Sequence, residues 1–163
     1  MPGVRLQMTI RTASLLLVAA IASPSAMAWQ TKDPLCGPLR DFVRSVGPSE
    51  VRDISFHTMW GGNFKDTSEP AIFAKRCFHH SYDPAKPVCT FLMEHGATEF
   101  SDNNVKRVAA CLSRTRFAPQ FSLHEATFSF SHGSDDRGAH VTVAYGEDSK
   151  LGGMAMHLSV SGY

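Results

Sequence analysis

The chain has 163 residues, of which 43% are hydrophobic and 19% are charged. This length allows one domain, and the composition excludes a disordered or collagen-like protein. Sixteen Lys and Arg residues stand against fifteen Asp and Glu residues, which gives a net charge of +1. Because there is no basic surplus to hold a phosphate backbone, we expect no nucleic-acid partner.

The first 28 residues have the three parts of a secretory signal peptide. Arg5 and Arg11 precede an apolar run over residues 13–22, and Ala26-Met27-Ala28 supplies the small residues of a cleavage site. The run has about half of the length that a helix needs to cross a ~30 Å hydrocarbon layer. We therefore expect cleavage to release a single domain over residues 29–163, which is periplasmic or secreted and is not inserted in a membrane.

The first predicted element of this domain is an amphipathic helix. Asp33-Pro34 is typical of a helix start, and apolar residues then recur at helical spacing from Leu35 to Val46, before Gly47-Pro48. Apolar and polar residues alternate over 54–60, which predicts a half-buried strand that ends at Gly61-Gly62.

The middle of the chain is predicted to be helical. Ser68-Glu69-Pro70 is a plausible helix start that leads to Cys77, with a short strand as the alternative. Two further helices are expected over 83–96 and 101–112. Residues 29–114 would then be mainly helical with one strand.

After Pro119 three segments alternate with period two, over 121–131, 140–145 and 154–160, and polar, glycine-rich loops join them. They predict an antiparallel meander within residues 120–163. One register places Phe130 opposite Val141 and Phe128 opposite Val143, with Val143 then facing Met156, so that one face is apolar. The predicted fold is α+β, with a helical layer on one face of a mostly antiparallel sheet of three to four strands.

The domain keeps four cysteines, an even number that predicts disulfides in an exported chain. We expect Cys77 to pair with Cys89, because these residues flank a turn between two elements, and Cys36 then pairs with Cys111. A bridge from Cys89 to Cys111 is the alternative. There is no C-x-x-C pair to indicate a zinc site or a reactive thiol.

All eight histidines lie within residues 29–163, so metal binding has to be considered. His57, His140 and His157 are predicted on the polar face of the sheet, where three imidazoles could bind zinc or copper. The predicted register makes His140 and His157 only diagonal neighbours, and no carboxylate is expected beside them. The prediction is therefore no metal site and no cofactor, with a metal-binding protein or metal-dependent enzyme as an alternative.

No sequence motif supplies a catalytic site, since no G-x-S-x-G elbow is present. The candidate contact residues are two aromatics around a glycine turn, two acids at a hairpin tip and two histidines of the polar face. They are Trp60, Phe64, Asp135, Asp136, His140 and His157. The sequence thus favours an exported small binding protein with a protein partner in the cell envelope, such as an inhibitor or immunity-type protein. A structural component of the envelope is a further alternative.

Overall fold

The computed structural model describes residues 33–113, 117–118 and 120–163, all within one compact unit. The predicted signal peptide lies outside the described residues. The elements follow the chain as α1 (Cys36–Ser45), β1 (Val51–Trp60), β2 (Phe73–Phe78), a 3-10 turn (Asp83–Ala85), α2 (Lys86–His95), α3 (Asp102–Ser113), β3 (Ala126–Gly133), β4 (Gly138–Glu147) and β5 (Met154–Gly162). In the described part of the chain, no helix has both the length and the apolar character needed to cross a membrane.

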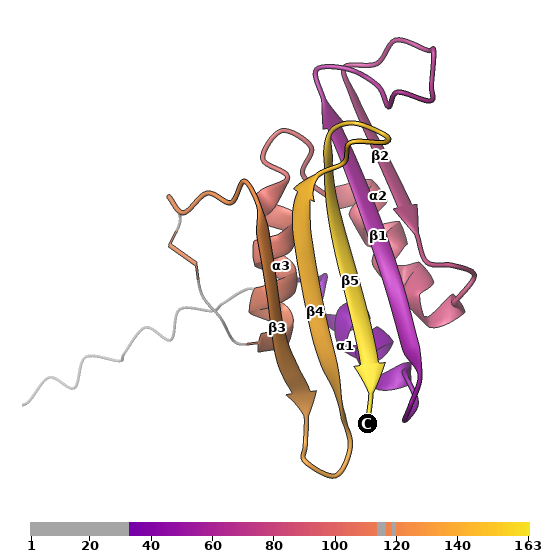
Figure 1. Ribbon diagram of the computed structural model, residues 1–163, viewed down its shortest axis with the longest axis vertical. Coiled ribbons are helices and arrows are strands. Elements are labelled where there is room, and N and C mark those ends of the chain that lie inside the picture. Colours follow the sequence, from indigo (N-terminus) through magenta and orange to yellow (C-terminus); the bar gives the residue numbers. More distant parts are fainter. Residues whose placement is uncertain (1–32, 114–116, 119) are drawn as a thin grey trace, which may run out of the picture. The chain divides into compact units, whose positions relative to one another are not determined.

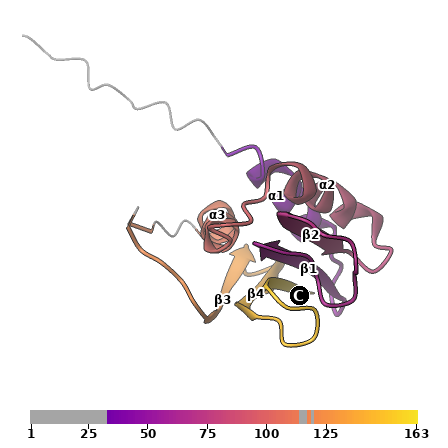
Figure 2. The same cartoon turned by 90° about the horizontal axis from the view of Figure 1, so that it is seen from above.

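The five strands form one antiparallel sheet in the order β2-β1-β5-β4-β3. The three helices cover one face of this sheet and leave the other face open (Figure 1, Figure 2). The α+β class and the C-terminal meander are confirmed, but the sheet has five strands rather than three or four. Strands β1 and β5 are inner strands, whereas β2 and β3 form the two edges.

The extra strand is β2, where the sequence favoured a helix over residues 68–77. Here the short-strand alternative is right, because Phe73–Phe78 pairs with β1 and places Cys77 opposite Phe56. An apolar run this short fits helical and strand periods equally well, and the tertiary partner decides between them. The aromatic residues at both of its ends suit a pleated strand.

The predicted register is right for one strand pair and shifted for the next. Phe128 lies opposite Val143 as expected, but Val143 faces Leu158, and Met156 instead faces Tyr145. A shift of two residues keeps every side chain on its predicted face of the sheet. The apolar face is therefore confirmed although the pairing was wrong.

Helix α1 packs on the apolar face through the residues whose spacing predicted it. Leu39 and Phe42 are fully buried. At the start of the helix, the Asp33 carboxylate accepts a hydrogen bond of 3.0 Å from the Leu35 amide and pairs with Arg107 of α3 at 2.7 Å. This ion pair joins the first and last helices.

Both predicted disulfides are present. Cys36–Cys111 joins α1 to α3 with a Cα–Cα distance of 4.9 Å, and Cys77–Cys89 joins β2 to α2 at 5.4 Å. Each helix of the layer is thus linked covalently to another element. The two bonds are compatible with a periplasmic or secreted location.

Candidate functional site

Three large apolar side chains are exposed together where the first hairpin turns. Trp60 ends β1 and lies directly opposite Phe73, the first residue of β2, and Ile72 precedes Phe73. Their exposed fractions are 50% for Trp60, 53% for Phe73 and 75% for Ile72. We call these three residues the hairpin-end patch. Figure 1 shows this end of β1 and β2 at the top of the sheet.

The patch is exposed because the helical layer stops short of it. Along the helix-facing side of the hairpin, the pair Phe56–Cys77 is followed by Thr58–Lys75 and then by Trp60–Phe73. Lys75 Nζ donates hydrogen bonds to the carbonyl oxygens of Glu94 and Gly96, at 3.5 and 3.1 Å. These carbonyls mark the C-terminal end of α2, so the next cross-strand pair lies beyond the helix.

Phe64 keeps the loop between β1 and β2 in place from the inside. Its side chain is 1% exposed, and the Arg76 guanidinium lies 4.7 Å from the centre of its ring. Arg76 also binds both carboxylate oxygens of Asp66, with Nη2–Oδ1 at 2.8 Å. In this structure Phe64 therefore has a structural place in the interior, and the contact role predicted for it stays a prediction.

The same loop is tied to the loop between β4 and β5. The Lys65 amide donates to the Leu151 carbonyl at 2.8 Å, and Lys65 Nζ donates to the Ser149 carbonyl at 3.0 Å. Within the hairpin, the Gly61 amide donates to the Ile72 carbonyl at 2.9 Å. These bonds fix the backbone that carries the patch, which lowers the entropy lost on binding.

Beside these loops the buried His57 lies close to the partly buried Asp148. His57 is on the open face of β1, as predicted, but the loops cover it, and its side chain is 7% exposed. His57 Nδ1 lies 3.0 Å from Asp148 Oδ2, although without the direction of a hydrogen bond. Asp148 Oδ1 accepts the amides of Lys150 and Leu151, which shapes the β4–β5 loop.

The environment favours the neutral form of His57 and the charged form of Asp148. Burial lowers the pKa of His57, and this effect outweighs the attraction of the nearby Asp148 carboxylate. The Leu151 amide is the largest cause that lowers the pKa of Asp148. Near neutral pH we therefore expect a neutral imidazole beside a carboxylate.

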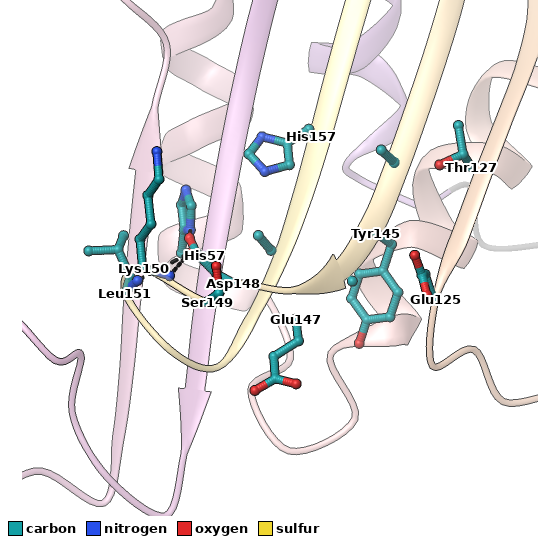
Figure 3. Close-up of a pocket in the computed structure, with 13 residues that line it drawn as sticks. His57, Glu125, Thr127, Tyr145, Glu147, Asp148, Ser149, Lys150, Leu151 and His157 are labelled. Atoms are coloured by element: carbon teal, nitrogen blue, oxygen red, sulfur yellow. Dashed lines mark hydrogen bonds and ion pairs between the residues drawn. The ribbon is translucent and has the colours of Figure 1, made fainter.

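His57 and His157 line an open pocket of about 610 Å³ beside the β4–β5 loop (Figure 3). The two imidazole rings stand edge to face, with 5.7 Å between their centres. His157 Nδ1 is 2.9 Å from Ser55 Oγ, which is the spacing of a base and a hydroxyl nucleophile. Glu125 and Glu147 also line this pocket.

A base and a hydroxyl at this distance do not by themselves make an acyl-transfer site. Ser55 and His157 lie on the inner strands β1 and β5, whose amides are used by the sheet. An oxyanion needs free donors close to the nucleophile. The backbone amides of the paired positions in β1 and β5 are engaged by the sheet, so we interpret Ser55 and His157 only as a polar pair on the open face.

His57, His140 and His157 do not form a common metal site. His140 pairs with Ser131 and Ser161 further along the sheet, and its ring lies against Tyr163, with 4.7 Å between the ring centres. Among the residues that the structure describes, no three His, Cys, Asp or Glu side chains are placed to hold an ion. The three-histidine hypothesis is thus not supported.

The predicted contact residues do not form one surface. Asp135 and Asp136 lie in the exposed turn between β3 and β4, at the opposite end of the sheet from Trp60 (Figure 1). His140 is near that turn, and the exposed His157 lies between the two ends. A contact role for these four residues stays a prediction.

Comparison with protein-family models, with curated proteins and with solved structures gave no match to this chain. Its site therefore has to be inferred from its own residues.

The sequence pointed to Trp60 but missed the other two residues of the patch. Ile72 and Phe73 fell within the segment that was expected to be helical. A signal was present in the aromatic residues Phe73 and Phe78 at the two ends of a six-residue run. Asp148 was expected only as a turn residue, and no local pattern indicates that it reaches His57.

Proposed function

We propose that this protein is an exported binding protein whose hairpin-end patch docks onto a protein partner of the cell envelope, in the manner of an inhibitor or immunity-type protein. The observation that carries this proposal is the exposure of Trp60, Ile72 and Phe73 on a loop fixed from below by Phe64. Adjacent exposed aromatic and aliphatic side chains of this kind are typical of interface hot spots.

The binding free energy that burial of the patch could supply fits such a role. An aromatic side chain buries about 150–250 Å² in all, and about half of each is exposed here, so a partner would cover roughly 100 Å² of Trp60 and as much of Phe73. At ~25 cal/mol per Å², each would contribute about 2–3 kcal/mol. Such contributions, on a surface that is already ordered, are enough to decide an affinity.

The partner that this surface fits offers an apolar recess. The charged side chains of β2, Lys75 and Arg76, already have partners within the chain. Recognition at the patch would therefore rest on apolar burial and shape rather than on ion pairs, and we expect it to depend weakly on salt.

The test compares single substitutions in the hairpin-end patch with one at the opposite end of β1. Protein made from the full chain and recovered after export is immobilised, and envelope proteins retained by it are identified and titrated. We expect Trp60→Ser and Ile72→Ser each to weaken retention by roughly 30-fold, which corresponds to about 2 kcal/mol. Val51→Ser is the matched control, since Val51 is 57% exposed at the opposite end of the same strand.

Equal retention of the envelope partner by all three variants would contradict this proposal. It would also be contradicted if no envelope protein bound to Val51→Ser protein but failed to bind to Trp60→Ser protein. Those results would favour the alternative of a structural envelope component. Melting curves of each variant establish that the comparison is made between folded proteins.

A further inference from the structure

The two edge strands of the sheet differ in how they are protected. Strand β2 carries Lys75 and Arg76 in its middle, and charges of this kind prevent one sheet edge from pairing with another. Strand β3 reads Ala-Thr-Phe-Ser-Phe-Ser-His-Gly and contains no Asp, Glu, Lys, Arg or Pro. Its eight residues are therefore an unguarded edge.

The structure describes no element that covers this edge. β3 pairs with β4 on one side and contacts α3 behind it, and it forms the outer border of the sheet in Figure 1. Phe128 and Phe130 point to the helix face, yet both are only partly buried, and their rings are stacked with 6.3 Å between centres. Part of each ring is therefore exposed.

We propose that β3 is the interface between two copies of this chain, which pair antiparallel across a two-fold axis at Ser129 to give a continuous ten-stranded sheet. This pairing is independent of the docking function proposed for the hairpin-end patch. Because the patch adjoins the β2 edge, a dimer formed at β3 leaves both patches free.

The register follows from the symmetry. With Ser129 opposite Ser129 of the second copy, Phe128 lies opposite Phe130 of the second copy, and Thr127 lies opposite Ser131 of the second copy. These central pairs match apolar with apolar on the helix face and hydroxyl with hydroxyl on the open face, and at the two ends Ala126 lies opposite His132 of the second copy. Such hydroxyl pairing already occurs on this face, where Ser129 Oγ lies 2.8 Å from Thr142 Oγ1 of β4.

The charges favour a second copy at β3 and oppose one at β2. Antiparallel pairing of β3 with itself over residues 126–132 sets no like charges against each other. A face-matched pairing of β2 with itself, centred on either of its middle residues, would place Lys75 opposite Lys75 or Arg76 opposite Arg76. The self-complementary edge is thus β3.

Cysteine cross-linking tests the proposed register directly. Residues directly opposite in an antiparallel pair have Cα atoms about 4.5–5.5 Å apart, which a disulfide can join. We expect exported Ser129→Cys protein to form a disulfide-linked dimer, with the two native disulfides intact by peptide mapping. In Ser131→Cys protein the two new thiols would be roughly 13 Å apart along the strands, so little cross-linked dimer should form.

The molar mass in solution, measured from micromolar to millimolar concentration, provides the second test. We expect the mass of the wild-type protein to rise from one chain to two, and that of Ser129→Lys protein to stay at one chain. Ala74→Lys introduces the same charge on β2 and should behave as wild type. Melting curves check that each variant is folded, and if Ser129→Lys protein does not fold, the cross-linking result decides.

The proposal is overturned if wild-type protein keeps the mass of one chain at every concentration and Ser129→Cys protein forms no linked dimer. It is also overturned if Ser129→Lys protein dimerises like wild type, or if the new thiol of Ser129→Cys protein links only to a different protein. Efficient linkage of Ser131→Cys but not of Ser129→Cys would overturn the proposed register.

Discussion

At the scale of single residues, the site depends on what the loops bury. Trp60 and Phe64 flank the same glycine turn, and one is half exposed while the other lies in the interior. Hydrophobicity and spacing treat the two aromatics alike. The difference arises because Arg76 of β2 reaches over the Phe64 ring, a contact that requires the hairpin to be formed first. The buried aromatic therefore supports the position of the exposed one.

The buried His57 should make the stability of the protein depend on pH. Its folded-state pKa lies below the usual value of about 6.5, because burial disfavours the charged form. The unfolded chain then binds this proton more tightly than the folded chain does. The free energy of unfolding should therefore fall as the pH drops through about 6.5, until the pH passes below the folded-state pKa.

Urea denaturation of wild-type and His57→Gln protein between pH 8 and pH 5 measures this effect. We expect the stability of the variant to fall less steeply on acidification than that of the wild type. His124→Gln, which replaces an exposed histidine outside the sheet, is the control and should keep the wild-type slope. Equal slopes for wild type and His57→Gln would show that the buried imidazole carries none of the pH dependence.

At the scale of elements, the sequence predicted most of the fold. The helices and the meander follow from periodicity and capping, and the cysteine pairing follows from the turn between Cys77 and Cys89. Strand β2 could not be predicted in this way, because its six residues are compatible with the period of a helix and with that of a strand. Their conformation is decided by pairing with β1. The register of β5 against β4 was also beyond the sequence, since a shift of two residues leaves the apolar face unchanged.

The two disulfides should stabilise these elements to different extents. Cys36–Cys111 closes a loop with a sequence separation of 75, and Cys77–Cys89 one of only 12. In the chain-entropy description, the longer loop contributes about 4 kcal/mol and the shorter about 3 kcal/mol. We expect the Cys36→Ala/Cys111→Ala protein to lose more stability in urea denaturation than the Cys77→Ala/Cys89→Ala protein. The reverse order would indicate that the bond between β2 and α2 has an additional role in holding the edge strand.

At the scale of the whole molecule, strand order decides which candidate residues come together. Because β1 lies beside β5 and runs antiparallel to it, Trp60 lies at the end of the sheet where the β4–β5 loop turns, and Asp135 lies at the other. The sequence alone could nominate both residues but could not place them, since neither periodicity nor turn chemistry fixes the order of non-consecutive strands. The open face, the hairpin-end patch and the β3 edge are likewise products of this order.

The domain with both disulfides formed should exist only after export. We expect protein made from the full chain and collected outside the cytoplasm to begin at Trp29 and to show no free thiol. Its melting temperature should fall by at least about 10 °C in reductant, because loss of the disulfides costs about 4 kcal/mol or more. Protein made in a reducing cytoplasm without residues 1–28 is the control, and it should have four free thiols and the lower melting temperature. Mass spectrometry and thiol titration measure both features. An exported protein that retained its first 28 residues would contradict the signal peptide, whereas four free thiols or an unchanged melting temperature in reductant would contradict the role of the disulfides.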